Sequence, residues 1–321
     1  MILTVTINPL LEQQFTYKKV SLKIQNRNGK LKLAAGGKGI NVSRQLNKLN
    51  IQNIALTFAG GKYGKFFRDL IRKESIAFSL INTNSETRIC SVIIDSEKSK
   101  LSYFFGENQV ITPEETVKFI SKMEKMIQNC EIVIFSGSSP CKETDIIFPA
   151  GINLAAKYDK ISICDTYGDH LADCYSAAPK IVHNNVDEVT KSLQVKLENE
   201  GDKINYLNGL YNKGIKQVFL TNGENKTYAS NFDFHYSVTV PKINTLDPTG
   251  SGDAFVAGIA YGWNKKLAFV EQIKFASALG SANAKTSDVC NVSWEEANKL
   301  IETVEVKSVG KKIKILNDTP N

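Results

Sequence analysis

The sequence predicts an α/β fold in which a mostly parallel sheet lies between layers of helices. Short apolar segments, typical of buried strands, alternate with segments of helical periodicity along most of the 321 residues. Two β-rich stretches, near residues 13–33 and 88–107, interrupt this alternation and predict a small extra sheet that could form a lid. No linker or internal repeat divides the chain, so we expect a single domain over residues 1–321.

The first half of the chain is expected to open with a buried strand over residues 2–7, which Asn8-Pro9 ends. Asn28-Gly29 lies between two semi-alternating runs, 15–24 and 30–33, and this pattern predicts a hairpin. The other elements expected here are helices over 40–49, 65–73 and 113–129, and strands over 54–59, 88–94 and 101–105.

The second half continues the alternation of strands and helices. We expect strands at 132–135, 161–164, 181–182 and 218–220, with one or two more within 228–240. We expect helices over 146–158, from about 187, over 203–212, 254–262, 268–284 and 294–301. Ligands of parallel sheets bind beyond the carboxyl ends of the strands, so the loops at those ends are the candidate sites.

Composition narrows the classes of function. The chain is 42% hydrophobic and 23% charged, which is typical of a folded domain, and its formal net charge is +7. The positive charge is dispersed, which suits anionic small substrates better than nucleic acid. The six cysteines are scattered without a C-x-x-C pair, so neither a zinc site nor a disulfide framework is indicated. With no signal peptide and no membrane-length apolar run, we expect a cytoplasmic protein.

The segment 247–253, Asp-Pro-Thr-Gly-Ser-Gly-Asp, is the strongest candidate for a chemical site. Its glycines allow a tight turn directly before a helix, whose first N–H groups are unpaired and carry the positive end of the dipole. The amides of Gly250, Ser251 and Gly252 could therefore bind a phosphate. Asp253 could then take a proton from an attacking hydroxyl. The alternative is an ordinary glycine turn before a buried helix.

A second glycine loop, Gly36-Gly37-Lys38-Gly39, also precedes a helix. Its spacing fits neither a P-loop nor a dinucleotide fingerprint. A polar ligand could lie on the backbone at Gly37, with Lys38 and Asn41 bound to its hydroxyls or phosphate. A tight turn with an exposed lysine is the alternative.

Four further side chains could contact a phosphorylated substrate. Arg27 and Arg88 lie in the two β-rich stretches, and the planar guanidinium suits a phosphate, although either could be a surface residue. Glu12 follows the first strand and could accept hydrogen bonds from sugar hydroxyls or be solvated. Ser138, in the turn after the strand at 132–135, offers a hydroxyl, or the turn is an ordinary one.

Residues after two later strands could contact a nucleotide. Asn185 and Glu188 share one face of a helix start, where they could meet a phosphate and hydrated Mg²⁺, or simply cap the helix. Thr221 and Gly223 end another strand and could meet a phosphate chain. The three histidines show no metal spacing, and we interpret them as structural or surface residues: His170, His183 and His235.

Taken together and in this order, the motifs resemble those of the PfkB (ribokinase-like) family of carbohydrate kinases. The resemblance covers nearly the whole chain and is closest to the branch with tagatose-6-phosphate kinase and 1-phosphofructokinase. The matching segments are 4–9 (Thr-Val-Thr-Ile-Asn-Pro), 35–42 (Ala-Gly-Gly-Lys-Gly-Ile-Asn-Val), 136–140 (Ser-Gly-Ser-Ser-Pro), Asn185-x-x-Glu188 and 250–253 (Gly-Ser-Gly-Asp).

This resemblance implies a ribokinase-like, Rossmann-like core with a β-sheet lid that often mediates a dimer. It implies that ATP with Mg²⁺ donates a phosphoryl group to a hydroxyl of a sugar phosphate. The roles implied by the match are a base (Asp253), an anion hole (Gly250, Ser251, Gly252), sugar binding (Glu12, Gly37, Lys38, Asn41, Ser138), phosphate binding (Arg27, Arg88), nucleotide binding (Asn185, Thr221, Gly223) and metal binding (Glu188).

The chain also departs from the family pattern. Glu12 stands where the family usually has Asp, His183-Asn184-Asn185 replaces Lys-Pro-Asn, and Lys226 stands at a usual glycine of the nucleotide loop. Residues 106–109 lack the usual Gly-Pro. A ketohexose phosphate is the expected substrate. A kinase of an unphosphorylated sugar or nucleoside, and a sensor that binds without turnover, are the alternatives.

Overall fold

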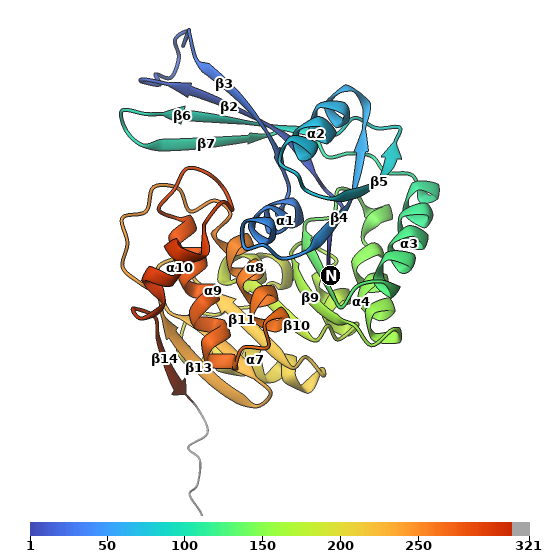
Figure 1. The fold of residues 1–321 in the computed structure, drawn as a ribbon, viewed down its shortest axis with the longest axis vertical. Helices are drawn as coiled ribbons and strands as arrows, with labels where there is room; N and C mark the ends of the chain where they lie inside the picture. The colour runs from blue at the N-terminus through green and yellow to red at the C-terminus, as the bar shows by residue number, and fades with distance from the viewer. Residues whose placement is uncertain (310–321) are drawn as a thin grey trace, which may run out of the picture.

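The computed structural model describes residues 1–309 and confirms the α/β fold: a large, mostly parallel sheet lies between helices (Figure 1). Seven parallel strands form its main part, in spatial order β11 (Gln217–Thr221), β10 (Ile181–Asn185), β9 (Ile161–Thr166), β8 (Ile132–Gly137), β1 (Ile2–Thr6), β4 (Asn53–Gly60) and β5 (Phe78–Thr83). Three antiparallel strands extend it beyond β11, namely β12 (Thr227–Asn231), β13 (Phe234–Thr239) and β14 (Glu305–Val309).

Helices cover both faces of this sheet because its buried strands have apolar side chains on both sides. Ile132 and Ile134 of β8 pack toward one layer, while Val133 and Phe135 pack toward the other. The first layer contains α1 (Lys38–Lys48), α8 (Ser251–Asn264), α9 (Phe269–Asn283) and α10 (Trp294–Ile301). The second contains α3 (Pro113–Gln128), α4 (Ile147–Lys157), α5 (Leu171–Ser176) and α7 (Glu200–Asn212).

Helices α8 and α9 pack unusually closely in the first layer. Gly258 of α8 faces Ala276 of α9, and a Cβ at position 258 would lie 2.6 Å from the Ala276 Cα. A real Cβ does not approach another carbon to this distance, so only glycine fits at this crossing.

Two further α-helices and a 3-10 helix, η1 (Lys142–Thr144), belong to the described chain. The helix α2 (Gly61–Lys73) packs Phe67 and Ile71 against β4, and α6 (Val186–Leu193) directly follows β10. None of the helices within residues 1–309 has the length and apolar character needed to cross a membrane.

A separate four-stranded sheet projects from the body of the molecule, at the upper left of Figure 1. We call it the lid sheet; its order is β3 (Lys30–Gly36), β2 (Leu10–Tyr17), β6 (Arg88–Asp95) and β7 (Lys100–Phe105). It contains both β-rich stretches that interrupt the strand–helix alternation. The expected pairing of the two runs that flank Asn28-Gly29 is confirmed, because β2 and β3 are antiparallel neighbours. The tight turn is wrong, because β2 ends at Tyr17 and residues 18–29 form a long loop before β3. Leu22 and Ile24 in that loop are 87% and 67% exposed. Their alternating apolar pattern therefore does not correspond to a buried strand face.

Candidate active site

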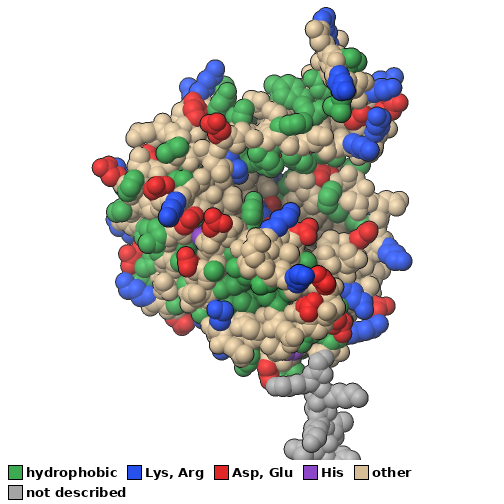
Figure 2. All heavy atoms as spheres, turned by 180° about the vertical axis from the view of Figure 1, so that it is seen from behind, with side chains coloured by type: hydrophobic (Ala, Val, Ile, Leu, Met, Phe, Trp, Pro, Cys, Tyr) green, Lys and Arg blue, Asp and Glu red, His purple; other side chains and the backbone are tan. Residues whose placement is uncertain are grey.

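A large cavity lies at the carboxyl ends of the parallel strands, between the lid sheet and the N-termini of α1 and α8. Its volume is about 1410 Å³. Figure 2 shows the molecular surface around the hollow beneath the projecting lid sheet. Of the residues expected in the site, fourteen line this cavity: Glu12, Gly37, Lys38, Asn41, Arg88, Ser138, Asn185, Glu188, Thr221, Gly223, Gly250, Ser251, Gly252 and Asp253.

Arg27 is the exception. It lies in the exposed loop between β2 and β3, its guanidinium bonds to Gln25, and it does not line the cavity. The reason is the early end of β2 at Tyr17, which places the following residues at the outer end of the lid sheet. Within this chain, the paired-arginine phosphate site expected from the sequence therefore has only Arg88.

The backbone at the start of α8 turns through a left-handed glycine, which leaves amides facing the cavity without a covering side chain. Gly250 is the N-cap with φ 77°, and a Cβ there would lie 2.4 Å from Val289 Cγ1, so both conformation and space demand glycine. The Ser251 amide donates to the Pro248 carbonyl at 3.1 Å, so an anion would rely on the neighbouring amides of Gly250 and Gly252. Asn283 of α9 fixes the loop by donating to the Thr249 carbonyl at 2.8 Å.

Asp253 lies in the first turn of α8 and is 5% exposed. The Asn41 side-chain amide donates to its Oδ2 at 2.7 Å, which joins the two glycine loops directly. Burial is the main cause that raises the pKa of Asp253 to about 6; Lys38 opposes this shift, whereas Asp165 and Glu188 add to it. A carboxylate with this pKa is suited to accept a proton near neutral pH.

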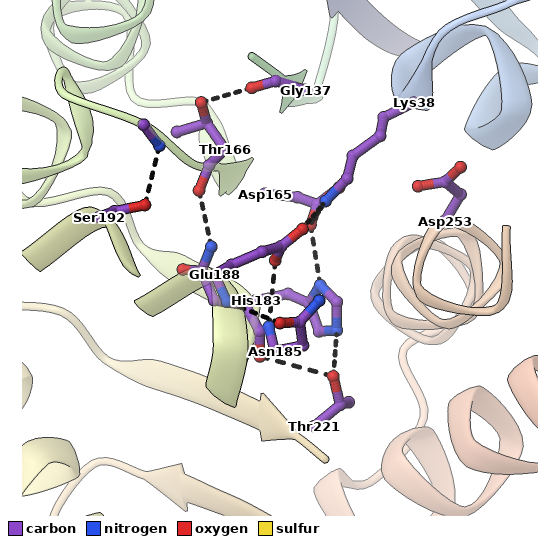
Figure 3. A network of polar contacts seen from close by, with 12 residues as sticks. Lys38, Gly137, Asp165, Thr166, His183, Asn185, Glu188, Ser192, Thr221 and Asp253 are labelled. Atoms are coloured by element: carbon purple, nitrogen blue, oxygen red, sulfur yellow. Dashed lines mark hydrogen bonds and ion pairs between the residues drawn. The ribbon is translucent and has the colours of Figure 1, made fainter. Parts of the chain in front are cut away.

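Lys38 extends from the start of α1 across the cavity toward acids on β9 and α6 (Figure 3). Its Nζ lies 2.6 Å from Glu188 Oε1 and 3.4 Å from Asp165 Oδ1, and 4.9 Å from the centre of the Tyr167 ring. Burial would lower the pKa of Lys38, but the surrounding negative charges outweigh it and raise the pKa above its usual value. The ammonium therefore lies on the side of the cavity where the sequence predicts the nucleotide.

Asn185 and Glu188 form a helix cap, which is one of the two alternatives that their spacing predicts. Asn185 Oδ1 accepts from the Glu188 amide at 2.8 Å, and Glu188 Oε2 accepts from the Asn185 amide at 3.1 Å. Because Oε1 of Glu188 remains turned toward Lys38, the same residue both caps α6 and faces the cavity.

His183, interpreted from the sequence as a structural or surface residue, lines the cavity. Its Nδ1 lies 2.9 Å from Asp165 Oδ1, and since a carboxylate only accepts, Nδ1 carries the hydrogen. The Nε2 atom lies 3.3 Å from Thr221 Oγ1, and the ring stacks on Phe255 of α8. Burial alone would raise the pKa of Asp165, but Lys38 and His183 lower it below its ordinary value.

The lid side of the cavity contains Arg88 and Glu12. Arg88 donates to the Asn8 carbonyl at 3.1 Å and to Asn108 at 3.0 Å, and burial lowers its pKa. Its Nε is buried and has no hydrogen-bond partner among the described residues. Burial raises the pKa of Glu12 despite a hydrogen bond from Gln14. Ser138 accepts from the Asn8 side chain at 3.0 Å.

The cavity residues that are not among the candidates of the sequence analysis include Tyr167, Arg44 and Tyr103. Asp165, which is fully buried and pairs with Lys38, is not among the candidates either. A signal existed for Asp165, because it follows an apolar strand in the same way as the candidates that were selected. The others depend on neighbours distant in the chain. Tyr103 of the lid sheet, for example, bonds Thr249 at 2.6 Å.

Comparison with known proteins gives consistent results. The family model described as pfkB family carbohydrate kinase matches residues 12–297. A tagatose-6-phosphate kinase from Staphylococcus epidermidis is 26% identical over 313 residues, covering 96% of this chain and all of that protein.

Two solved structures share the fold. A possible 1-phosphofructokinase from Thermotoga maritima has a TM-score of 0.89 at 24% identity, covering 96% of this chain and 99% of its own. Phosphofructokinase-2 from Escherichia coli has a TM-score of 0.86 at 20% identity, covering 94% and 98%.

Proposed function

Because the chain belongs to the pfkB family of carbohydrate kinases, we propose that it transfers the γ-phosphoryl group of ATP to a hydroxyl of a ketohexose phosphate. The main supporting observation is the buried carboxylate of Asp253, which lies in the first turn of α8 beside the amides of Gly250 and Gly252. ATP as the donor follows from membership of a carbohydrate kinase family. Tagatose 6-phosphate and fructose 1- or 6-phosphate are the candidate acceptors.

In the proposed reaction Asp253 accepts the proton of the attacking hydroxyl while the phosphoryl group moves in line from donor to acceptor. The bare amides at the start of α8 and its dipole stabilise the charge that develops on the phosphoryl oxygens. Lys38 adds a positive charge close by, since its ammonium lies among Asp165, Glu188 and Asp253. Catalysis is then mainly a matter of position and charge.

The site fits a hydrated Mg²⁺ better than a fully coordinated one. Within the described residues, no three His, Cys, Asp or Glu side chains form a group able to hold a metal. Magnesium in kinases commonly keeps several waters and binds through one or two carboxylates together with phosphates. Glu188 and Asp165 are the carboxylates that would hold the ion in this mode. Asp165 Oδ2 is buried without a partner among the described residues, and Glu188 lines the cavity with Oε1 bonded to Lys38, which would have to give way to the ion. The ion would neutralise phosphate charge.

For the sugar, Arg88 is the candidate for the phosphate already present, since its Nε has no partner within residues 1–309 and a guanidinium can donate in a fork. Lys32, Arg44 and Lys48 also line the cavity and add positive charge. Glu12 reaches one methylene further than the aspartate usual in the family, and we expect it to accept hydrogen bonds from sugar hydroxyls.

A substrate panel tests this proposal. Purified protein with ATP and Mg²⁺ would be assayed on fructose 1-phosphate, fructose 6-phosphate, tagatose 6-phosphate and the matching free sugars, with ADP release as the readout. We expect turnover with at least one sugar phosphate and a much lower rate with the free sugars. A higher rate with a free sugar would instead indicate a kinase of unphosphorylated sugars. No ADP release above background would favour a sensor.

Asp253→Asn tests the role of the base. Turnover should fall by at least about 10²-fold, because base catalysis and its electrostatic contribution are both lost. The exposed Asp69→Asn on α2 is the matched control and should keep the wild-type rate. Binding of the sugar phosphate, measured by calorimetry, should survive in Asp253→Asn. Equal turnover in the two variants would remove Asp253 from the mechanism.

We also propose that two copies of the chain associate through the lid sheet. Strand register places Phe15, Leu31 and Ile93 side by side, and Leu33 and Phe104 one pleat further, on the face opposite to Glu12 and Tyr103. Leu31 and Phe104 are 55% and 60% exposed. Hydrophobic side chains gather on this projecting part of the surface in Figure 2. An apolar sheet face of this kind is typical of a protein interface.

A further inference from the structure

The amide of Asn41 has to be held in one orientation to serve Asp253. Its Nδ2 donates to Asp253 Oδ2 at 2.7 Å. An amide rotated by half a turn would place its oxygen against the carboxylate, which repels it. Nitrogen and oxygen ends of an amide have the same shape, so only the surrounding hydrogen bonds decide between the two orientations.

Arg44 fixes the orientation of the Asn41 amide. It lies three residues after Asn41 on α1, which places both side chains on the same helix face. Its Nη1 donates to Asn41 Oδ1 at 2.8 Å. A guanidinium has donors only, so it can bond the oxygen end of the amide but not the nitrogen end. The bond therefore turns the amide nitrogen toward Asp253.

Arg44 is itself fixed by two other elements. Its Nε lies 2.6 Å from Glu74 Oε2, directly after α2, and its Nη2 donates to the carbonyl of Ala35 at 2.7 Å. Ala35 belongs to β3 of the lid sheet, at the entrance to the first glycine loop. The side chain is only 17% exposed, so solvent screens these contacts weakly. A planar fork with three partners in three directions has little freedom to move.

We propose that Arg44 is a positioning residue for the proposed base, acting through Asn41: it locks the amide so that Asp253 keeps a hydrogen-bond donor. This inference rests on the proposed function of Asp253. Arg44 and Asp253 are 209 residues apart in the sequence. The fold brings them close, because α1 and α8 pack side by side in the first helical layer. Nothing in its own motif assigns it this task.

The charged groups around Asp253 define the expected signature. Lys38 and Asn41 face it from α1, Asp165 from β9 and Glu188 from α6, while Cys290 lies in the loop after α9. The Asn41 hydrogen bond lowers the pKa of Asp253, so loss of the ordered donor raises that pKa further. Fewer molecules then have an ionised base at neutral pH.

The test compares Arg44→Met, Asn41→Leu and the double variant with wild type. The titration of the Asp253 carboxyl is followed by carbon-13 NMR of Asp-labelled protein, with the signal assigned by its loss in Asp253→Asn. Arg44→Met should move the midpoint upward by about one unit and lower kcat near pH 6.5 by about tenfold, with KM for ATP little changed. The double variant should be no worse than Asn41→Leu, because both act through one bond.

Arg72→Met, an exposed arginine on α2, is the matched control and should titrate as wild type. Thermal unfolding shows whether each variant is folded. Should Arg44→Met fail to fold, Arg44→Lys keeps the charge but not the fork, and its midpoint should also move upward. A wild-type midpoint in folded Arg44→Met or Arg44→Lys, or fully additive losses in the double variant, would overturn the proposal. The NMR readout needs no turnover, so it remains informative even if the proposed kinase reaction is wrong.

Discussion

At the scale of single residues, the raised pKa of Asp253 leads to a prediction about pH. A base must be ionised to accept a proton, and burial raises this pKa to about 6. We therefore expect kcat/KM to rise with pH through about 6 and to level off above it. The measurement is kcat/KM from pH 5 to 8 with the best sugar of the panel at saturating ATP. A limb centred near pH 4, typical of an unperturbed aspartate, would contradict the assignment.

The same shift affects stability, with a definite sign. The folded-state pKa of Asp253 is about 6, above the unfolded value near 3.9, so the native state holds this proton more tightly. Its contribution to stability is therefore lost as pH rises from about 4 to about 6. Asp253→Asn should be more stable than wild type at pH 8, by roughly 1–3 kcal/mol, and nearly equal at pH 4. Urea unfolding at the two pH values measures this, and a constant difference would argue against the shift.

The sequence predicts which residues next to the glycine motifs line the cavity, but it does not predict where their side chains point. Asp253 and Asn41 line the cavity because their motifs fix the local backbone. Arg27 does not, because its position depends on where β2 ends and the long loop begins. Lys38 lines the cavity but turns toward Glu188, a residue 150 positions away, and no local pattern contains that information.

At the scale of elements, the contact between β7 and the loop before α8 predicts coupling between lid and anion site. Tyr103 Oη lies 2.6 Å from Thr249 Oγ1 and 3.3 Å from Asp247 Oδ2, and Lys32 of β3 pairs with Asp288 at 3.1 Å. Tyr103→Phe keeps the ring and removes these bonds. Kinase kcat should fall by about 2–10-fold, the value of one or two net hydrogen bonds. Tyr211→Phe on α7 is the matched control, and an equal rate in both variants would argue against coupling.

Elements with strong periodicity were predictable, and those that depend on tertiary contacts were not. The parallel strands of the centre are apolar on both faces and stand out in the sequence. Among the strands and α-helices of residues 1–309, three are absent from the sequence prediction: β5, α5 and β14. Strand β5 lies at the sheet edge and is only partly buried, so its apolar signal is weak. The edge strand β14 consists mostly of exposed residues and pairs, among the described strands, with β13 alone.

At the scale of the whole molecule, the apolar outer face of the lid sheet predicts a dimer. Leu31→Ser and Phe104→Ser together should convert the dimer to a monomer, because they remove the most exposed apolar area of that face. Sedimentation at several protein concentrations measures this. Phe66→Ser on α2, which is 41% exposed and outside the lid sheet, is the control and should leave the dimer intact. A wild-type protein that is monomeric at all concentrations would refute the association.

The close approach of Gly258 to Ala276 has a consequence at the other end of α8. Position 258 is two turns, or about 10 Å, from the helix start that holds Asp253. No side chain separates the two helices at this crossing, so the position of the phosphate-binding end of α8 depends on the hydrogen atom that glycine has in place of a Cβ. Gly258→Ala should thus displace the helix axis and reduce kcat, although the residue contacts no ligand. A crystal structure of the variant beside its kinetics would separate this tilt from simple loss of stability.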